Sequence, residues 1–155
     1  MLKINELAPE FALFDKDNNL IKRSDYLGKW VVIYFYPKDN TPGCTTQAKT
    51  YEENLNEFKK RGIEVIGISK DSVASHSNFA SKHNLTFTLL SDPSLEVLKA
   101  YEVWGPKKMY GREYEGVIRS SYLIDPNGVI RGAFSKVSPK NDALTILKYY
   151  DEISN

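Results

Sequence analysis

The sequence predicts an α/β protein in which a mixed β-sheet has helices on both faces. Short apolar runs alternate with amphipathic segments in the first half of the chain, the order typical of α/β folds. Two apolar runs near residues 120–134 flank Asp-Pro-Asn-Gly, the pattern of a β-hairpin. A chain of 155 residues is long enough to bury roughly 70% of its unfolded surface. We therefore expect residues 1–155 to form a single domain.

The strongest local signals surround the first apolar run. Residues 30–36 are apolar, β-branched and aromatic, which favours a buried strand, and Pro37 ends the run. Thr41 and Pro42 then form the N-cap and N1 pair that opens helices. Apolar residues at spacings of 3 and 4 predict one helix up to residue 61, ending at Gly62: these are Ala48, Tyr51, Leu55 and Phe58.

The remaining elements follow from the same periodicities. We expect strands over residues 63–68, 86–90, 120–124 and 129–134, and a helix over residues 72–83. Asp92-Pro93 is expected to cap a short helix that carries Leu95, Leu98 and Tyr101. Ser138-Pro139 is expected to open the last helix, with Leu144, Leu147 and Tyr150 on one face. Residues 107–115 are polar and contain glycine, which predicts a long loop.

Composition excludes several classes of function. The net charge of +1, with acids and bases interspersed, gives no basic face for nucleic acid. No segment approaches the ~20 apolar residues of a membrane helix, and the amino terminus lacks an apolar leader, so we expect a cytoplasmic protein. His76 and His83 lie seven residues apart without a third ligand of suitable spacing. We expect both histidines at the surface, and no metal, haem or other cofactor.

Cys44 is the only cysteine, and it falls in the first turn of the expected helix. With Thr41 as N-cap, Gly43 is N2 and Cys44 is N3. Unpaired N–H groups and the helix dipole favour a thiolate at such a position, which indicates a nucleophile. The alternative is a buried thiol that only packs, as most single cysteines do. The position alone does not decide between the two.

Three longer motifs decide between these two interpretations. Residues 36–47 are Tyr-Pro-Lys-Asp-Asn-Thr-Pro-Gly-Cys-Thr-Thr-Gln. Residues 101–111 contain Trp-Gly-Pro-Lys-Lys-Met-Tyr-Gly, and residues 119–125 are Arg-Ser-Ser-Tyr-Leu-Ile-Asp. The first segment resembles the Pro-x-x-x-Thr-x-x-Cys motif of the peroxiredoxins, and all three resemble the bacterioferritin comigratory protein or peroxiredoxin Q group. The resemblance spans nearly the whole chain and implies a thioredoxin-like fold of the AhpC/TSA type and a thiol-dependent peroxidase.

The chain departs from that group in one respect. Its members often carry a second, resolving cysteine five residues after the first, where this chain has Lys49. Others place it in the next helix, and residues 72–83 contain no cysteine either. An internal disulfide cannot form, so the resemblance implies a one-cysteine enzyme that depends on thioredoxin, glutaredoxin or a small thiol. We expect a monomer or a weak homodimer.

Reduction of a peroxide needs donors where negative charge develops on the departing oxygen. The candidates are the N–H groups of Gly43 and Cys44, the Thr41 hydroxyl and one cation. Arg119 is our choice for the cation. It stands at the start of an apolar strand, where a charged residue is uncommon unless it has a partner or a function. Thr41 has an alternative role as helix cap, compatible with catalysis, and Arg119 has the alternative of an ordinary strand-edge charge.

Four other residues have less specific roles. Pro37 ends a strand, and the resemblance implies that its ring also shields the thiolate from water. Gln47, one turn after Cys44, is either a solvated helix residue or orients Arg119 through its amide. Tyr36 and Trp104 are candidate walls of a substrate pocket, although such aromatic residues are more often part of a core.

Competing chemistries of a lone cysteine fit poorly. A thiol–disulfide oxidoreductase needs Cys-x-x-Cys, but residue 47 is Gln. A phosphatase loop needs Arg six residues after the cysteine, where Thr50 stands. A cysteine hydrolase needs a nearby histidine, and neither histidine is expected near Cys44. The sequence thus predicts reduction of hydrogen peroxide and organic hydroperoxides through a sulfenic acid. The alternative is a sensor that peroxide oxidises once, without efficient turnover.

Overall fold

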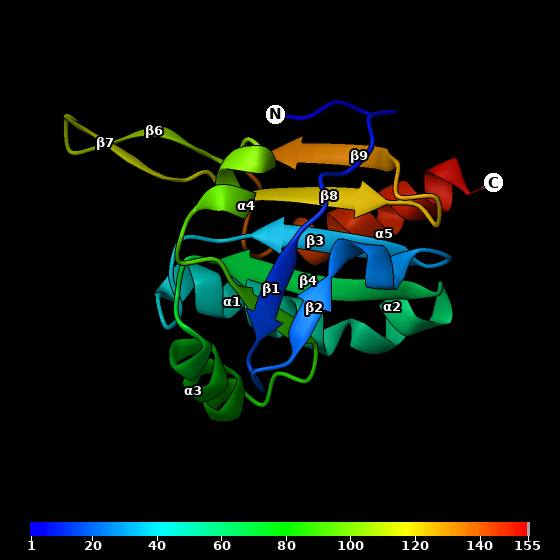
Figure 1. Ribbon diagram of the computed structural model, residues 1–155, viewed down its shortest axis with the longest axis horizontal. Coiled ribbons are helices and arrows are strands. Elements are labelled where there is room, and N and C mark those ends of the chain that lie inside the picture. The colour runs from blue at the N-terminus through cyan, green and yellow to red at the C-terminus, as the bar shows by residue number, and fades with distance from the viewer. Residues whose placement is uncertain (155) are drawn as a thin grey trace.

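The computed structural model describes residues 1–154, which build a seven-stranded mixed sheet in the order β2-β1-β5-β4-β3-β8-β9 (Figure 1). The strands are β1 (Ala12–Asp15), β2 (Leu20–Lys22), β3 (Trp30–Phe35), β4 (Ile63–Ser69), β5 (Thr88–Ser91), β8 (Ser120–Ile124) and β9 (Ile130–Ser135). The predicted thioredoxin-like α/β class is confirmed. The sheet is mixed because β3, β4 and β5 are parallel neighbours, whereas the other pairs are antiparallel.

Helices lie on both faces of this sheet. They are α1 (Pro42–Glu53), α2 (Leu55–Lys60), α3 (Val73–His83), α4 (Glu96–Ala100) and α5 (Asp142–Ile153), with a 3-10 turn η1 (Arg23–Tyr26). One buried cluster joins α1, α2, α3 and α5 to alternate residues of β3, such as Val32 and Tyr34. A second cluster joins α4 and the N-terminal segment to the intervening residues of β3, such as Ile33. The full burial of β3 explains its unbroken apolar run.

Three expected helices have different bounds in the structure. The single helix predicted up to residue 61 is two, because Asn54 leaves the helical conformation and its amide donates a hydrogen bond to the Thr50 carbonyl at 2.9 Å. The last helix begins at Asp142, later than Ser138-Pro139 suggested. Of the three residues predicted on its apolar face, Leu147 is buried and Tyr150 packs against the core, whereas Leu144 is 52% exposed.

The short helix α4 begins at Glu96 rather than directly after Asp92-Pro93. Leu95 precedes it in a left-handed conformation with φ 68°. Asp92 still serves the helix, because its carboxylate accepts the Leu98 N–H at 2.9 Å. The antiparallel pair β1 and β2 near the amino terminus was not predicted, because both strands are too short to give a clear alternating pattern.

The predicted polar loop over residues 107–115 is in fact a β-hairpin. Its strands are β6 (Trp104–Met109) and β7 (Arg112–Val117), and they project from the main sheet at the upper left of Figure 1. Tyr110 and Gly111 form its two-residue turn, with φ 53° and 77°. Type I′ turns require positive φ at both positions, and a tyrosine there hides the usual Asn-Gly signal.

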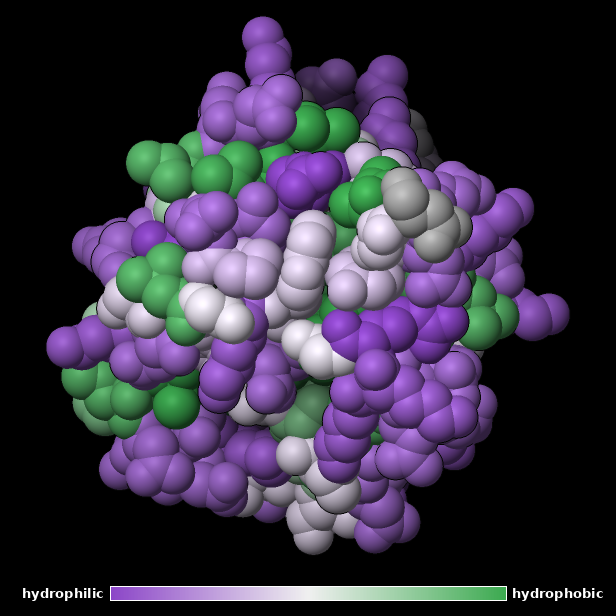
Figure 2. Space-filling model, turned by 90° about the vertical axis from the view of Figure 1, so that its right-hand side faces the viewer, coloured by the Kyte–Doolittle hydropathy of each residue, from purple (hydrophilic) through white to green (hydrophobic). Residues whose placement is uncertain are grey.

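The surface is mixed in character. Figure 2 shows one face on which hydrophobic residues form separate patches between hydrophilic ones. In the part of the chain that the structure describes, no helix is both long enough and apolar enough to cross a membrane.

Candidate active site

Cys44 lies in the first turn of α1, on the sheet face that α5 also covers, and its residue is only 1% exposed. The Thr45 N–H bonds to the Thr41 carbonyl at 2.9 Å and is the first to join the helical pattern. The N–H groups of Gly43 and Cys44 precede it and have no acceptor within the helix. They point toward the end of the helix that attracts negative charge.

Thr41 is at the N-cap position, but its hydroxyl does not cap the helix. The hydroxyl instead donates to the Lys38 carbonyl at 2.8 Å, so the expectation of a side-chain cap was wrong. With its proton used in this way, the oxygen presents acceptor lone pairs. Thr41 was predicted to donate a hydrogen bond to the departing oxygen. In the structure its hydroxyl is instead placed to accept one.

Arg119 reaches the sulfur from the other side. It directly precedes β8, which pairs with β3 so that Ser120 lies opposite Phe35, near the segment that leads to Cys44. One nitrogen of its guanidinium, Nη1, is 3.5 Å from Cys44 Sγ. An added Cβ at Gly43 would lie 3.1 Å from the other terminal nitrogen, so glycine leaves room for the guanidinium.

Gln47 positions Arg119 by a hydrogen bond, and Asp142 in turn positions Gln47. The Gln47 Oε1 accepts a 2.6 Å hydrogen bond from Arg119 Nη1, so the residue is not a solvated helix position and is fully buried. Its Nε2 donates to Asp142 Oδ2 at 2.9 Å. Burial raises the pKa of the Asp142 carboxyl, although hydrogen bonds from Ser121, Tyr51 and Gln47 act against the shift. Asp142 is not among the predicted site residues, because its only signal in the sequence is an acid near a helix start.

His76 is buried, which corrects the expectation that both histidines lie at the surface. Its Nδ1 is 2.7 Å from Asp39 Oδ2, and its Nε2 is 2.9 Å from the Leu90 carbonyl. Both partners are acceptors, so the geometry matches a ring that carries both protons. Burial alone would raise the pKa of Asp39, but hydrogen bonds and the charge of His76, with the Tyr36 hydroxyl, lower it. This pair ties the segment before Cys44 to α3.

Asp39, Asp71 and His76 place one potential ligand atom each within 4.8 Å of one another. These atoms are already engaged: Asp71 Oδ2 accepts the Asp39 N–H at 2.9 Å and the Ser69 hydroxyl at 2.6 Å. The cluster is therefore explained by its own hydrogen bonds and supports no metal site.

The two candidate pocket aromatics do not lie where expected. Tyr36 is 1% exposed, and its hydroxyl donates to Asp39 Oδ1 at 2.6 Å, so it packs behind the site and offers no surface to a substrate. Trp104 packs against the second core cluster, which lies on the opposite sheet face from Cys44, and its Nε1 donates to Glu115 Oε2. Pro37 is half-buried in the turn after β3.

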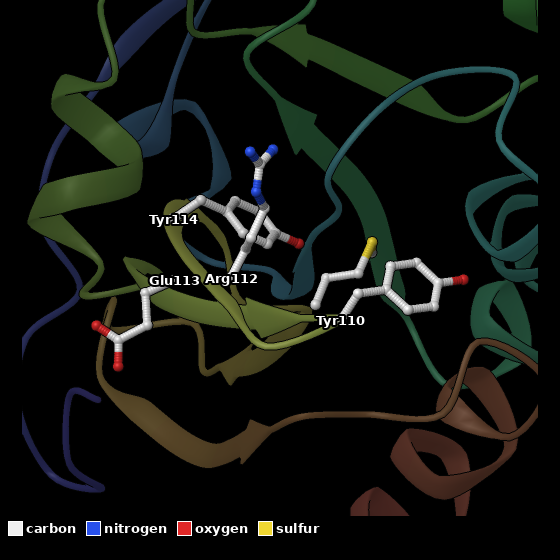
Figure 3. Close-up of a pocket in the computed structure, with 5 residues that line it drawn as sticks. Tyr110, Arg112, Glu113 and Tyr114 are labelled. Atoms are coloured by element: carbon white, nitrogen blue, oxygen red, sulfur yellow. The ribbon is translucent and has the colours of Figure 1, made fainter.

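A surface hollow adjoins Arg119. It is lined by Pro106, Lys107, Lys108, Ile118, Arg119, Lys136 and Val137. A second pocket lies at the tip of the β6-β7 hairpin, where Tyr110, Arg112, Glu113 and Tyr114 point in different directions (Figure 3). Binding sites bring polar groups together, and this pocket does not. Of these two pockets, only the hollow beside Arg119 has a candidate catalytic residue in its lining.

Comparisons with known proteins agree with this geometry. Residues 4–133 match the AhpC/TSA family. The chain is 42% identical over 151 residues to peroxiredoxin Bcp of Escherichia coli, covering 97% of each chain, and 39% identical over 153 residues to peroxiredoxin Bcp of Bacillus subtilis, covering 99% of this chain and 98% of the relative. A solved structure of Xylella fastidiosa PrxQ superimposes with a TM-score of 0.94 at 33% identity, over 100% of this chain and 99% of the other.

Proposed function

The chain belongs to the AhpC/TSA family and is a thiol-dependent peroxidase, and on that basis we propose that Cys44 is the residue that attacks the peroxide. The observation that carries this proposal is the 3.5 Å contact between Arg119 Nη1 and Cys44 Sγ at the start of α1. A cation and two helix N–H groups there favour a thiolate over a thiol. The thiolate is the nucleophilic form of cysteine.

The reaction consumes one peroxide in each oxidation. The Cys44 thiolate attacks the terminal oxygen, an S–O bond forms and the O–O bond breaks. The electron pair of that bond leaves on the second oxygen, which takes a proton and departs as water or an alcohol. Arg119 and the N–H groups of Gly43 and Cys44 stabilise the charge that develops on it. The Thr41 oxygen accepts the hydrogen bond of the incoming hydroperoxide, since its own proton is held by Lys38.

An external thiol completes the cycle, because Cys44 is the only cysteine. One thiol converts the sulfenic acid to a mixed disulfide and releases water. A second thiol then displaces Cys44 and leaves the reductant oxidised. Thioredoxin, glutaredoxin or a small thiol can fill this role. A reductant pool of this kind favours a cytoplasmic location. We further propose that residues 1–155 form a single domain and that the protein acts as a monomer or weak homodimer.

Xanthomonas campestris bacterioferritin comigratory protein, a structural relative with a TM-score of 0.88 at 36% identity, is described by its alkyl peroxide reduction activity. We propose that this protein also reduces organic hydroperoxides, in addition to hydrogen peroxide. The hollow beside Arg119, with apolar Ile118 and Val137 in its lining, supports this choice.

The test is steady-state consumption of hydrogen peroxide and an alkyl hydroperoxide with thioredoxin, glutaredoxin or a small thiol as reductant. We expect many equivalents of peroxide to be consumed with at least one of them. Consumption of a single equivalent with every reductant would instead favour the peroxide-sensing alternative. Comparing the reductants also identifies the physiological class of thiol.

A further inference from the structure

Asp142 is a buried carboxylate that the reaction described above does not use. It is the first residue of α5, where an acid normally faces solvent and the helix N–H groups, yet it is 2% exposed. Its Oδ2 accepts three side-chain hydrogen bonds: 2.9 Å from Gln47 Nε2, 2.7 Å from the Tyr51 hydroxyl and 2.6 Å from the Ser121 hydroxyl. Among residues 1–154, no donor reaches its Oδ1.

Burial of the Asp142 carboxylate lowers the stability of the fold. Removing a carboxylate from water costs several kcal/mol, which three hydrogen bonds to one oxygen offset only in part. Two of the donors, Tyr51 and Ser121, join α5 to α1 and β8 and would serve a purely structural anchor. The third donor, Gln47, instead contacts Arg119, which lies beside the cysteine.

The carboxylate determines which way the Gln47 amide points. An ionised carboxylate only accepts hydrogen bonds, so it must face the Nε2 of Gln47, and Oε1 then faces the other way. Oε1 meets Arg119 Nη1 at 2.6 Å, and the same Nη1 lies 3.5 Å from Cys44 Sγ. A flipped amide would place its NH₂ against the guanidinium, donor against donor. The order of contacts is therefore Asp142, Gln47, Arg119, Cys44.

We propose that Asp142 is a positioning residue for peroxide reduction, which holds Arg119 beside Cys44 by fixing the Gln47 amide. The proposal rests on the roles assigned above to Cys44 and Arg119. It distinguishes two effects of the same side chain. The hydrogen bond to Gln47 orients the guanidinium, while the negative charge acts on the cysteine in the opposite sense, because a nearby anion disfavours a thiolate.

The first test is Asp142→Ala, with the second-order rate constant for peroxide measured as a function of pH. At high pH the profile levels off where the thiol is fully ionised, and this plateau reports the attack step alone. We expect the plateau to fall about 10-fold or more, because small displacements of a catalytic group are expensive. Circular dichroism establishes that the variant is folded. Should it not fold, Asp142→Ser takes its place, since a serine hydroxyl is too short to reach Gln47.

A double-mutant cycle shows whether the effect passes through Arg119. In the Arg119→Met background, we expect Asp142→Ala to change the plateau by less than about 2-fold, because the residue it positions is gone. Equal losses in both backgrounds would overturn the proposal, as would an unchanged plateau in folded Asp142→Ala. If Arg119→Met alone left the rate unchanged, the role proposed for Arg119 would fall first, and this inference with it.

Two further variants separate positioning from structure and from charge. Tyr51→Phe removes another donor to the same oxygen without touching Gln47, and we expect its plateau to stay within about 2-fold of wild type. Asp142→Asn keeps an acceptor for Gln47 but loses the charge, so we expect a retained plateau and a pH profile shifted to lower pH. The other charged or titratable groups around this region are Arg119, Lys107, Tyr34, Tyr51 and Asp39. A loss in Tyr51→Phe equal to that in Asp142→Ala would mean that Asp142 is only an anchor.

Discussion

The guanidinium of Arg119 and the sulfur of Cys44 lie 3.5 Å apart, although 75 residues separate them in the sequence. The contact forms because β8 pairs with β3, which delivers Arg119 to the same edge of the sheet where the segment after β3 begins α1. Gln47, one turn further along α1, accepts a 2.6 Å hydrogen bond from the same guanidinium nitrogen, Nη1. The site is thus built by two neighbouring strands and one helix.

Replacing Arg119 tests whether this contact serves catalysis. A free thiol of pKa ~8.5 is already a few per cent ionised at pH 7, so losing thiolate alone explains about a 30-fold slower reaction. We expect Arg119→Met to slow peroxide attack by more than about 30-fold, because charge stabilisation is lost as well. Stopped-flow kinetics under pseudo-first-order conditions measure the rate. Arg112→Met on the exposed hairpin is the control and should react like wild type.

Gly43 offers a way to displace Arg119 without removing it. A Cβ at this position would approach Arg119 Nη2 to 3.1 Å, so the guanidinium must move in Gly43→Ala. We expect the peroxide rate to fall about 10-fold. Alanine is a better helix former than glycine, so the free energy of unfolding should not decrease. Gly105→Ala is the control, since its Cβ would meet only Ile118 Cδ1 at 3.4 Å. A wild-type rate in folded Gly43→Ala would show that the position of Arg119 is not critical.

The buried Asp39 and His76 pair predicts the acid side of the stability profile. The folded-state pKa of Asp39 is lowered from its usual 3.8. The ionised carboxylate therefore adds to the free energy of unfolding above pH 3.8, and this contribution is lost as the pH falls from 3.8 through the folded-state pKa. At pH 7 we expect Asp39→Asn to cost roughly 3 kcal/mol of unfolding free energy, because it leaves the His76 ring without its counterion. The difference from wild type should shrink below about pH 4, as urea unfolding at each pH would show.

Asp142→Asn is the matched control, and for it we expect the stability difference from wild type to change with pH in the opposite direction. Burial raises the folded-state pKa of Asp142, so its ionised form opposes folding above that pKa. As the pH falls toward the unfolded value of 3.8, this penalty is relieved in wild type. The wild type should therefore gain stability relative to Asp142→Asn on acidification, whereas it loses stability relative to Asp39→Asn. The same direction for both variants would contradict the two environments described above.

The missing second cysteine predicts how the enzyme fails. The sulfenic acid on Cys44 must wait for an external thiol, and a second peroxide can reach it first. We expect intact-mass spectra to show sulfinic acid on Cys44 under excess peroxide without reductant, and protection when a thiol is added. Persistence of the sulfenic form alone after prolonged excess would mean that the buried sulfur is closed to a second peroxide.

The parts that the sequence predicted correctly are those set by local chemistry. The apolar run of β3 and the Thr41-Pro42 helix start lie within short segments, and both are present in the structure. Errors arose where tertiary contacts decide. His76 is buried because Asp39, from a segment 37 residues earlier, supplies its counterion. Asp142 reaches Gln47 across 95 residues, a relation that no local pattern records.

The central claim is that Cys44 performs the chemistry, and Cys44→Ser tests it most directly. The substitution is small, so we expect circular dichroism and thermal unfolding to remain close to wild type. The measurement is steady-state peroxide consumption with excess enzyme-regenerating thiol. Peroxide consumption no faster than the thiol alone is the predicted result, and continued multiple turnovers by folded Cys44→Ser would contradict the account.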